Sequence, residues 1–161
     1  MTFEQLPDEA LFEACRQGEL RAFEHLLQRH RQPLYNFVCW QIGSSVVADG
    51  LLHEVFLRVL EEVRSKKQRA SFKTLLYVIA RDLCLRESSQ ANNLGDRHQK
   101  GPTRRIQNAI EELAIEEREV FLLREYLDLS FAQIAEIVGC DRKTVKERMR
   151  NALERLRQEV V

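Results

Sequence analysis

Residues 130–150, which read SFAQIAEIVGCDRKTVKERMR, constrain the fold of this chain more than any other segment. Ser130 and Gln133 have the spacing of a capping box, in which each side chain satisfies a free backbone N–H group at the start of a helix. Gly139 can adopt the left-handed conformation of a tight turn, and Asp141 can cap the helix that follows. The segment therefore predicts two short helices joined by a tight turn.

The second of these helices has one apolar face and one face rich in positive charge. At about 100° per residue, Val145 and Met149 fall on the apolar face. Lys143, Glu147 and Arg150 point directly away from it. This pattern is typical of a DNA-binding helix-turn-helix, with base edges in the middle of the face and phosphates at its margins; a solvated basic face on a helical hairpin is the alternative. The candidate DNA-binding residues are Arg142, Lys143, Thr144, Lys146, Glu147, Arg148 and Arg150.

The composition of the chain is helical and carries no net charge. Its 161 residues include only three prolines and six glycines, and the 25 Lys and Arg residues are equal in number to the 25 Asp and Glu residues. The basic residues of the helix-turn-helix are concentrated locally, while acidic residues between positions 111 and 119 balance them. Docking on phosphate depends on the local field rather than on the net charge. We therefore expect an all-α protein that can still bind DNA.

Several function classes lack the residues that they need. The sequence has no Gly-rich phosphate loop, no nucleophile elbow and no clustered metal ligands, so we expect neither an enzyme nor a bound metal or cofactor. No apolar run approaches the ~20 residues of a membrane-spanning helix, and the N-terminus lacks the layout of a signal peptide, so we expect a cytoplasmic protein without membrane insertion. The cysteines form no C-x-x-C pair and are expected to be reduced: Cys15, Cys39, Cys84 and Cys140.

The apolar pattern divides the chain into two helical blocks, which we interpret as two small domains. In residues 8–87 apolar side chains recur at three- and four-residue steps, with helix breaks expected near Gly18, Pro33 and Gly43. Residues 88–103 collect Ser, Asn, Gly and Pro and are expected to form a flexible linker. The second block, residues 104–161, contains the helix-turn-helix, and its expected helices are Arg104–Leu113, Glu116–Tyr126, Phe131–Val138 and Arg142–Arg157.

Both blocks resemble the domains of one protein family. The segments ACRQGELRAFEHLLQRHRQPLYNFV, LLHEVFLRVLEEV and FKTLLYVIARDLC resemble the polymerase-binding domain of bacterial extracytoplasmic-function sigma factors. The segment EEREVFLLREYLDLSFAQIAEIVGCDRKTVKERMRNALERLR resembles their promoter-reading C-terminal domain. The resemblance implies a transcription initiation factor whose partners are core RNA polymerase and promoter DNA, controlled by an anti-sigma factor or a regulatory kinase. The alternative is a helix-turn-helix DNA-binding regulator that does not act as a sigma factor.

The same resemblance assigns roles to three surfaces. The helix-turn-helix would read the minus-thirty-five element as duplex DNA. The residues that would bind polymerase are Asp49, Leu52, His53, Glu54, Phe56 and Leu57. The residues that would melt and read the minus-ten element are Lys66, Lys67, Arg69, Ser71, Lys73 and Asp82. Phe72 and Tyr77 lie beside this basic loop and could stack on unpaired bases, although core packing is the alternative for each of them.

The chain departs from the family pattern where the polymerase-binding helix begins. The segment Val47-Ala48-Asp49-Gly50 keeps one carboxylate where the family commonly has an acidic run, which predicts weaker or slower binding of polymerase. Phosphorylation of Ser44 or Ser45 would add negative charge beside this segment, so both serines are candidate modification sites. Asp82 stands where the family usually has Asn, which predicts a different base preference in the minus-ten element.

Overall fold

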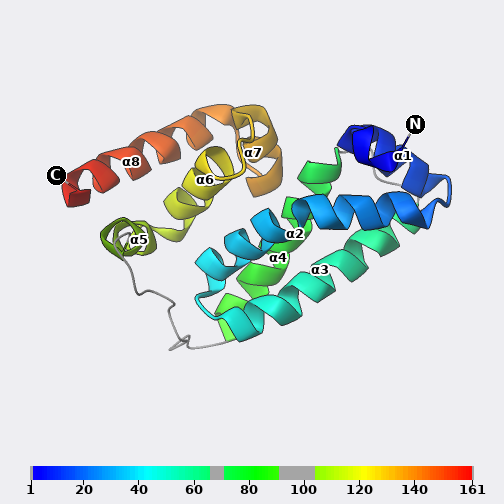
Figure 1. Cartoon of the computed structure of the whole chain (residues 1–161). Coiled ribbons are helices and arrows are strands. Elements are labelled where there is room, and N and C mark those ends of the chain that lie inside the picture. Colours follow the sequence, from blue (N-terminus) through cyan, green and yellow to red (C-terminus); the bar gives the residue numbers. More distant parts are fainter. Residues whose placement is uncertain (1, 66–70, 91–103, 161) are drawn as a thin grey trace.

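The structure is a computed structural model that describes residues 2–65, 71–90 and 104–160 of the chain. These residues form α-helices and one short 3-10 turn, with no β-strand among them, so the prediction of an all-α protein is confirmed. Figure 1 shows an N-terminal group formed by α1–α4 and a C-terminal group formed by α5–α8. The elements in chain order are η1 (Phe3–Gln5), α1 (Asp8–Arg16), α2 (Leu20–Ile42), α3 (Ser45–Ser65), α4 (Phe72–Gln90), α5 (Arg104–Glu111), α6 (Ile115–Glu125), α7 (Phe131–Val138) and α8 (Arg142–Val160).

In the N-terminal group, α2 and α4 pack on each other and each packs on α3, while α1 packs mainly on α2. The carboxylate of Asp8 fixes α1 to α2, because it accepts a hydrogen bond from Arg29 Nη1 over 3.1 Å and lies 2.7 Å from His30 Nε2. Burial lowers the pKa of His30, and the contact with Asp8 opposes that shift. The first helix is therefore joined to the core by a polar contact as well as by apolar packing.

The helix break expected at Pro33 is wrong, because α2 runs without interruption through it. Proline removes one backbone donor, but its fixed φ is compatible with a helix. The apolar face of α2 continues on both sides, where Leu26 and Leu34 are fully buried, and this packing keeps the two halves in one helix. The breaks expected near Gly18 and Gly43 are present: φ is +98° at Gly18 and +81° at Gly43, which ends α2.

The fourth helix extends further than the sequence suggested. It begins after Ser71, whose hydroxyl oxygen accepts the backbone N–H of Thr74 over 3.2 Å. It continues to Gln90, so the first residues of the expected linker 88–103 are helical. The remainder of that linker lies outside the described residues.

In the C-terminal group, α8 packs against α5, α6 and α7. The predicted capping box is present, since the Gln133 N–H donates to Ser130 Oγ over 3.1 Å and the Ser130 N–H donates to Gln133 Oε1 over 3.0 Å. Gly139 is left-handed at the turn, with φ +76°. Asp141 Oδ1 accepts the Thr144 N–H over 2.8 Å where α8 begins. The predicted pair of helices with a tight turn is confirmed.

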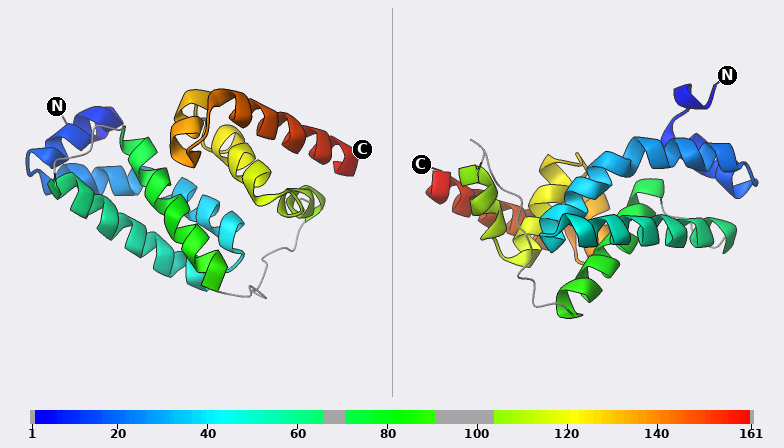
Figure 2. Two further views of the ribbon diagram at one scale, coloured as in Figure 1. Left: turned by 180° about the vertical axis from the view of Figure 1, so that it is seen from behind. Right: turned by 60° about the horizontal axis from the view of Figure 1, so that its bottom comes forward.

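The two groups pack against each other through α4 with α7 and through α2 with α6 (Figures 1 and 2). Polar contacts also cross this interface. Arg81 Nε of α4 donates to Glu119 Oε1 of α6 over 2.5 Å, and Lys73 Nζ of α4 donates to the carbonyl oxygen of Leu127 over 3.3 Å. The C-terminal group therefore covers part of α4, the helix to which the family resemblance assigns minus-ten recognition.

Candidate promoter and polymerase interfaces

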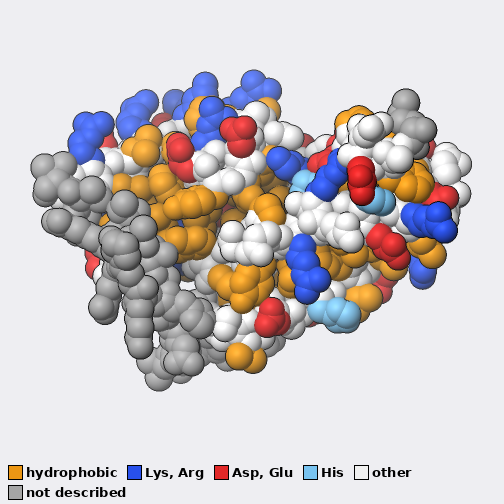
Figure 3. Space-filling view, viewed as in Figure 1, with side chains coloured by type: hydrophobic (Ala, Val, Ile, Leu, Met, Phe, Trp, Pro, Cys, Tyr) orange, Lys and Arg blue, Asp and Glu red, His pale blue; other side chains and the backbone are white. Residues whose placement is uncertain are grey.

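The side of α8 that points away from the core carries a strip of charged side chains. Val145 and Met149 are 0% and 5% exposed and hold the opposite side of the helix in the core. Figure 3 shows basic side chains along the edge of the molecule where α8 lies. We call this strip the α8 outer face, and it consists of the exposed residues Arg142, Lys143, Lys146, Glu147 and Arg150.

The other two predicted DNA-binding residues of α8 lie at the margin of this face. Thr144 is half-buried, and its backbone N–H is bound by Asp141 in the helix cap. Arg148 is also half-buried. Burial raises the pKa of Glu119 in α6, and the positive charge of Arg148 is among the causes that oppose this rise. Arg148 therefore lies at the edge of the outer surface, and its charge also acts on the buried carboxylate of Glu119.

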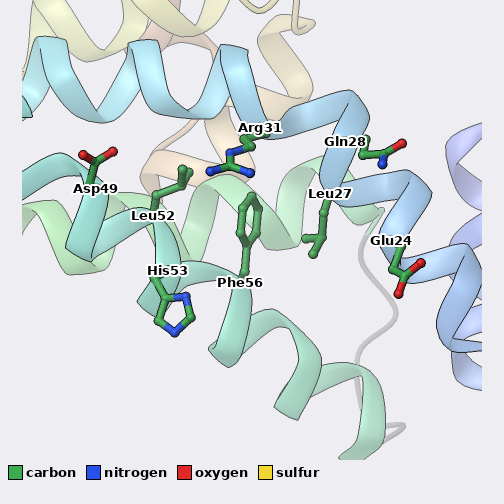
Figure 4. Close-up of a pocket in the computed structure, with 8 residues that line it drawn as sticks. All are labelled: Glu24, Leu27, Gln28, Arg31, Asp49, Leu52, His53 and Phe56. Carbon is green, nitrogen blue, oxygen red and sulfur yellow. The ribbon is translucent and has the colours of Figure 1, made fainter.

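A groove between α2 and α3 gathers Asp49, Leu52, His53 and Phe56 from the predicted polymerase-binding set. Its volume is about 600 Å³, and Figure 4 shows Leu52 and Phe56 of α3 pointing toward α2. The groove combines this apolar surface with charged side chains of both signs. We call it the α2–α3 groove, and its lining residues are Glu24, Leu27, Gln28, Arg31, Asp49, Leu52, His53 and Phe56.

The other two predicted polymerase-binding residues, Glu54 and Leu57, line a different groove. It lies between α3 and α4, has a volume of about 500 Å³, and also includes Arg58 and Ile79. Glu54 Oε1 accepts a hydrogen bond from Arg58 Nη2 over 3.1 Å. The sequence predicted one patch, and the structure divides it between two grooves on either side of α3.

The basic loop expected at the minus-ten element, with Lys66, Lys67 and Arg69, lies outside the described residues. Ser71, from the same predicted set, is half-buried at the start of α4. Its hydroxyl donates to Thr74 Oγ1 over 2.9 Å as well as accepting the Thr74 N–H. In this structure Ser71 is a helix cap.

Lys73 and Asp82, the remaining predicted minus-ten residues, both have partners within the protein. Lys73 donates to the Leu127 carbonyl across the interface between the two groups. Asp82 is about half exposed, and its Oδ2 lies 3.2 Å from Arg86 Nη2 and 3.9 Å from Arg58 Nη1. The structure does not bring Lys73 and Asp82 together, since the first faces the C-terminal group and the second faces α3.

Comparison with known proteins decides the family. The family model described as Sigma-70 region 2 matches residues 26–93, and the model described as Sigma-70, region 4 matches residues 103–156. Together the two models cover about three quarters of the chain, in the order of the two helical groups. The chain belongs to the sigma-70 family. As a sigma factor it directs RNA polymerase to promoters.

Similar proteins place this sigma factor in the extracytoplasmic-function group. It is 29% identical over 165 residues to the probable RNA polymerase sigma-C factor of Mycobacterium bovis, an alignment that covers 91% of this chain and 88% of the relative. It is 24% identical over 184 residues to the ECF RNA polymerase sigma-E factor of Haemophilus influenzae, with 98% and 97% of the two chains covered. The resemblance inferred from the sequence is confirmed.

Solved structures share the fold of this sigma factor. The structure of CnrH in complex with the cytosolic domain of CnrY superimposes with a TM-score of 0.77 at 20% identity, covering 94% of this chain and 95% of that one. The sigma factor RpoE from Bartonella quintana, in complex with the anti-sigma factor NepR, gives a TM-score of 0.72 at 19% identity and covers 86% and 96% of the two chains. Both helical groups are therefore part of the shared fold.

The two aromatic residues near the basic loop of the sigma factor are core residues. Phe72 and Tyr77 are both 0% exposed. The ring of Phe72 lies 5.5 Å from that of Phe12 and 5.2 Å from that of His30, and the ring of Tyr77 lies 5.5 Å from that of Phe37. Neither ring can stack on a base in this arrangement, so core packing is the correct interpretation.

Sequence reasoning missed the buried acid that joins the two groups of the sigma factor. It treated the acidic residues between 111 and 119 as balancing charges on a helix, but Glu119 is 1% exposed. Burial raises the pKa of Glu119, and the hydrogen bond and charge of Arg81 oppose that rise. The signal was present, because Glu119 precedes the buried Leu122 and Leu123 by three and four residues and so shares their helix face.

The expectations from the sequence also concern the cysteines and the other side chains that can bind a metal. Within the described ranges no three His, Cys, Asp or Glu side chains lie close enough together to hold a metal ion. The cysteines are free, and burial raises the pKa of Cys15 to about 11 and that of Cys84 to about 12. None of the described helices of the sigma factor has the length and apolar character needed to span a bilayer.

Proposed function

We propose that this sigma factor binds core RNA polymerase through the α2–α3 groove, reads the minus-thirty-five element with the α8 outer face, and reads the minus-ten element with α4 and the residues before it. The observation that carries this proposal is the α8 outer face. Four exposed basic side chains stand on the outward side of a helix that is capped at its start and preceded by a helix-turn-helix turn.

Shape and charge both suit α8 to duplex DNA. The major groove is about 12 Å wide and admits one α-helix, whose outward side chains then meet the base edges. Lys143 and Glu147, both exposed, would meet bases, while Arg142 and Lys146 beside them would meet phosphates. Phosphate contacts are salt-dependent and insensitive to sequence, so Lys146 would contribute affinity rather than selectivity.

The α2–α3 groove suits a protein partner. Leu52 and Phe56 offer an apolar surface against which a helix of the partner can pack, and the charges of Asp49 and Arg31 can orient it. Asp49 is the one carboxylate of residues 47–50. We therefore expect this contact to form more slowly than one with a full acidic run.

Ser44 and Ser45 stand where added negative charge would act on that contact. Ser44 Oγ lies 3.4 Å from the backbone nitrogen of Val47, at the start of α3. A phosphate there would be favoured by the helix dipole and would supply the charge that residues 47–50 lack. Control by a regulatory kinase at these serines is part of the proposal.

Simultaneous binding of both promoter elements requires the two groups to separate. The minus-ten and minus-thirty-five elements lie roughly 25 base pairs apart, which is about 85 Å of duplex at 3.4 Å per base pair. A compact chain of 161 residues has a radius of gyration of only about 15 Å. We infer that α4 leaves α7 when the factor is on a promoter, and that each group then raises the effective concentration of the other.

The proposed partners also indicate where the factor works and how it is controlled. A protein that binds core polymerase and promoter DNA acts in the cytoplasm. One of the similar solved structures holds its sigma factor in complex with the anti-sigma factor NepR. This supports an anti-sigma protein as a further partner of this chain.

Reconstituted transcription tests the proposed function. Core polymerase is supplied with this protein and a promoter library, and initiation that depends on the protein is the expected result. Asp49→Lys is expected to abolish initiation without weakening DNA binding, whereas Glu13→Lys, an exposed change on α1, serves as the matched control. Sequence-specific DNA binding without any initiation would instead support the helix-turn-helix regulator.

A further inference from the structure

We propose that Glu147 selects a cytosine in the minus-thirty-five element. This inference rests on the proposed function, because it requires α8 to lie in the major groove. It begins from the position of Glu147 on the helix. Val145 and Met149 define the core side of α8, and Glu147, two residues from each, lies about 160° around the helix from both. Glu147 is therefore the side chain that points most directly outward.

The charge of Glu147 is opposite to that of the residues around it. Every other side chain of the α8 outer face is basic, and Lys143 and Arg150 lie one turn before and one turn after it. Within the described part of the chain Glu147 nevertheless forms no ion pair. Its carboxylate oxygens are thus available to a ligand, while its charge opposes any approach to phosphate.

The chemistry of the major groove limits what such a carboxylate can bind. An ionised carboxylate only accepts hydrogen bonds. Guanine presents two acceptors in the major groove and thymine presents an acceptor and a methyl group, so both are unfavourable partners. Adenine presents an amino group beside the N7 acceptor, which would repel the second carboxylate oxygen. Cytosine presents its amino group without an adjacent acceptor, and it is the base that fits Glu147 best.

Holoenzyme binding to a duplex library with a randomised minus-thirty-five element tests this inference. The wild-type holoenzyme is expected to prefer cytosine about tenfold at one position. In Glu147→Ala that preference disappears, while overall affinity is unchanged or higher because a repulsive charge is lost. In Glu147→Gln the preference moves to adenine, since an amide can accept from the adenine amino group and donate to N7.

Glu154 provides the matched control. It is exposed on the same outward side of α8, seven residues later and therefore about 10 Å further along the helix axis. Glu154→Gln removes the same charge beyond the part of the helix that enters the groove, so it should leave the base profile unchanged. Circular dichroism and core-polymerase binding establish that each variant is folded.

The outcomes separate this inference from the proposed function. A wild-type holoenzyme with no base preference in this element would overturn the role of α8 and the inference with it. A wild-type preference that persists in Glu147→Ala, or a lost preference for a base other than cytosine, would overturn the assignment of Glu147 alone.

Discussion

Replacement of Arg81 by Ala is expected to separate the N-terminal and C-terminal groups of this sigma factor. Arg81 Nε donates to Glu119 Oε1 over 2.5 Å, and the Glu119 side chain is only 2% exposed. The substitution would leave this carboxylate buried without its hydrogen-bonded cation. The chain can relieve that cost by opening the interface, because Arg81 and Glu119 belong to different groups and water can then reach the carboxylate.

The size of the effect follows from the burial of the pair. Removal of one partner from a buried ion pair costs about 3–5 kcal/mol. The Arg81 side chain is 26% exposed, so solvent already screens part of its charge and the lower value, about 3 kcal/mol, applies. Because about 1.4 kcal/mol changes an equilibrium constant tenfold, the ratio of open to closed molecules should rise by about two orders of magnitude.

Small-angle X-ray scattering measures this opening directly. The closed chain should have a radius of gyration of about 15 Å, and Arg81→Ala should increase it without loss of helical circular dichroism. Arg58→Ala is the matched control, because its ion pairs with Glu54 and Asp82 join α3 and α4 within the N-terminal group.

The double variant Arg81→Ala with Glu119→Gln identifies the cause. A neutral amide costs less to bury than a carboxylate, so the double variant should close again. An unchanged radius of gyration in Arg81→Ala would show that the ion pair between Arg81 and Glu119 does not hold the two groups together. A double variant with the same radius of gyration as Arg81→Ala would show that the buried charge of Glu119 does not cause the opening.

Three further predictions concern stability and polymerase binding. Gly139→Ala should lower the free energy of unfolding by about 1 kcal/mol, because φ is +76° there. Gly50→Ala should raise it by about 0.5 kcal/mol, because Gly50 lies within α3 and the added Cβ would meet open space. Urea denaturation compares the two variants. Ser44→Glu with Ser45→Glu should tighten core-polymerase binding about threefold, and no gain would reject the phosphorylation hypothesis. Burial lowers the pKa of His30 in the folded protein below 6.5, so as the pH falls the unfolded chain binds a proton at this residue before the folded protein does. The free energy of unfolding should therefore fall as the pH drops below about 6.5. His30→Asn should remove this pH dependence.

The helix-turn-helix could be predicted from sequence because its determinants are local. The capping box joins Ser130 to Gln133, and the turn depends on the conformational freedom of Gly139. The helix breaks at Gly18 and Gly43 are also local, because glycine has no Cβ and therefore tolerates positive φ. Pro33 was predicted wrongly because its outcome depends on the burial of the helix on both sides of it, which is a tertiary effect.

The division of the polymerase-binding set could have been predicted from helical periodicity. Asp49, His53 and Phe56 follow steps of four and three residues and share one face of α3. Glu54 and Leu57 follow the same rule on another face. The resemblance grouped all of them by their place along the chain, whereas the helix separates them by angle. Their contacts with polymerase stay predictions.

The interface between the two groups could not be predicted from a single sequence, and it changes what the charges of the chain do. In the closed arrangement Arg81 is bound to Glu119, and Lys73 is bound to the Leu127 carbonyl. Opening would return both cations of α4 to solvent, where they can meet phosphates. DNA that binds only the open form would then shift the equilibrium toward opening by the energy of those new contacts. Promoter binding and opening would favour each other, so the closed arrangement would hold back the minus-ten surface until a promoter is engaged.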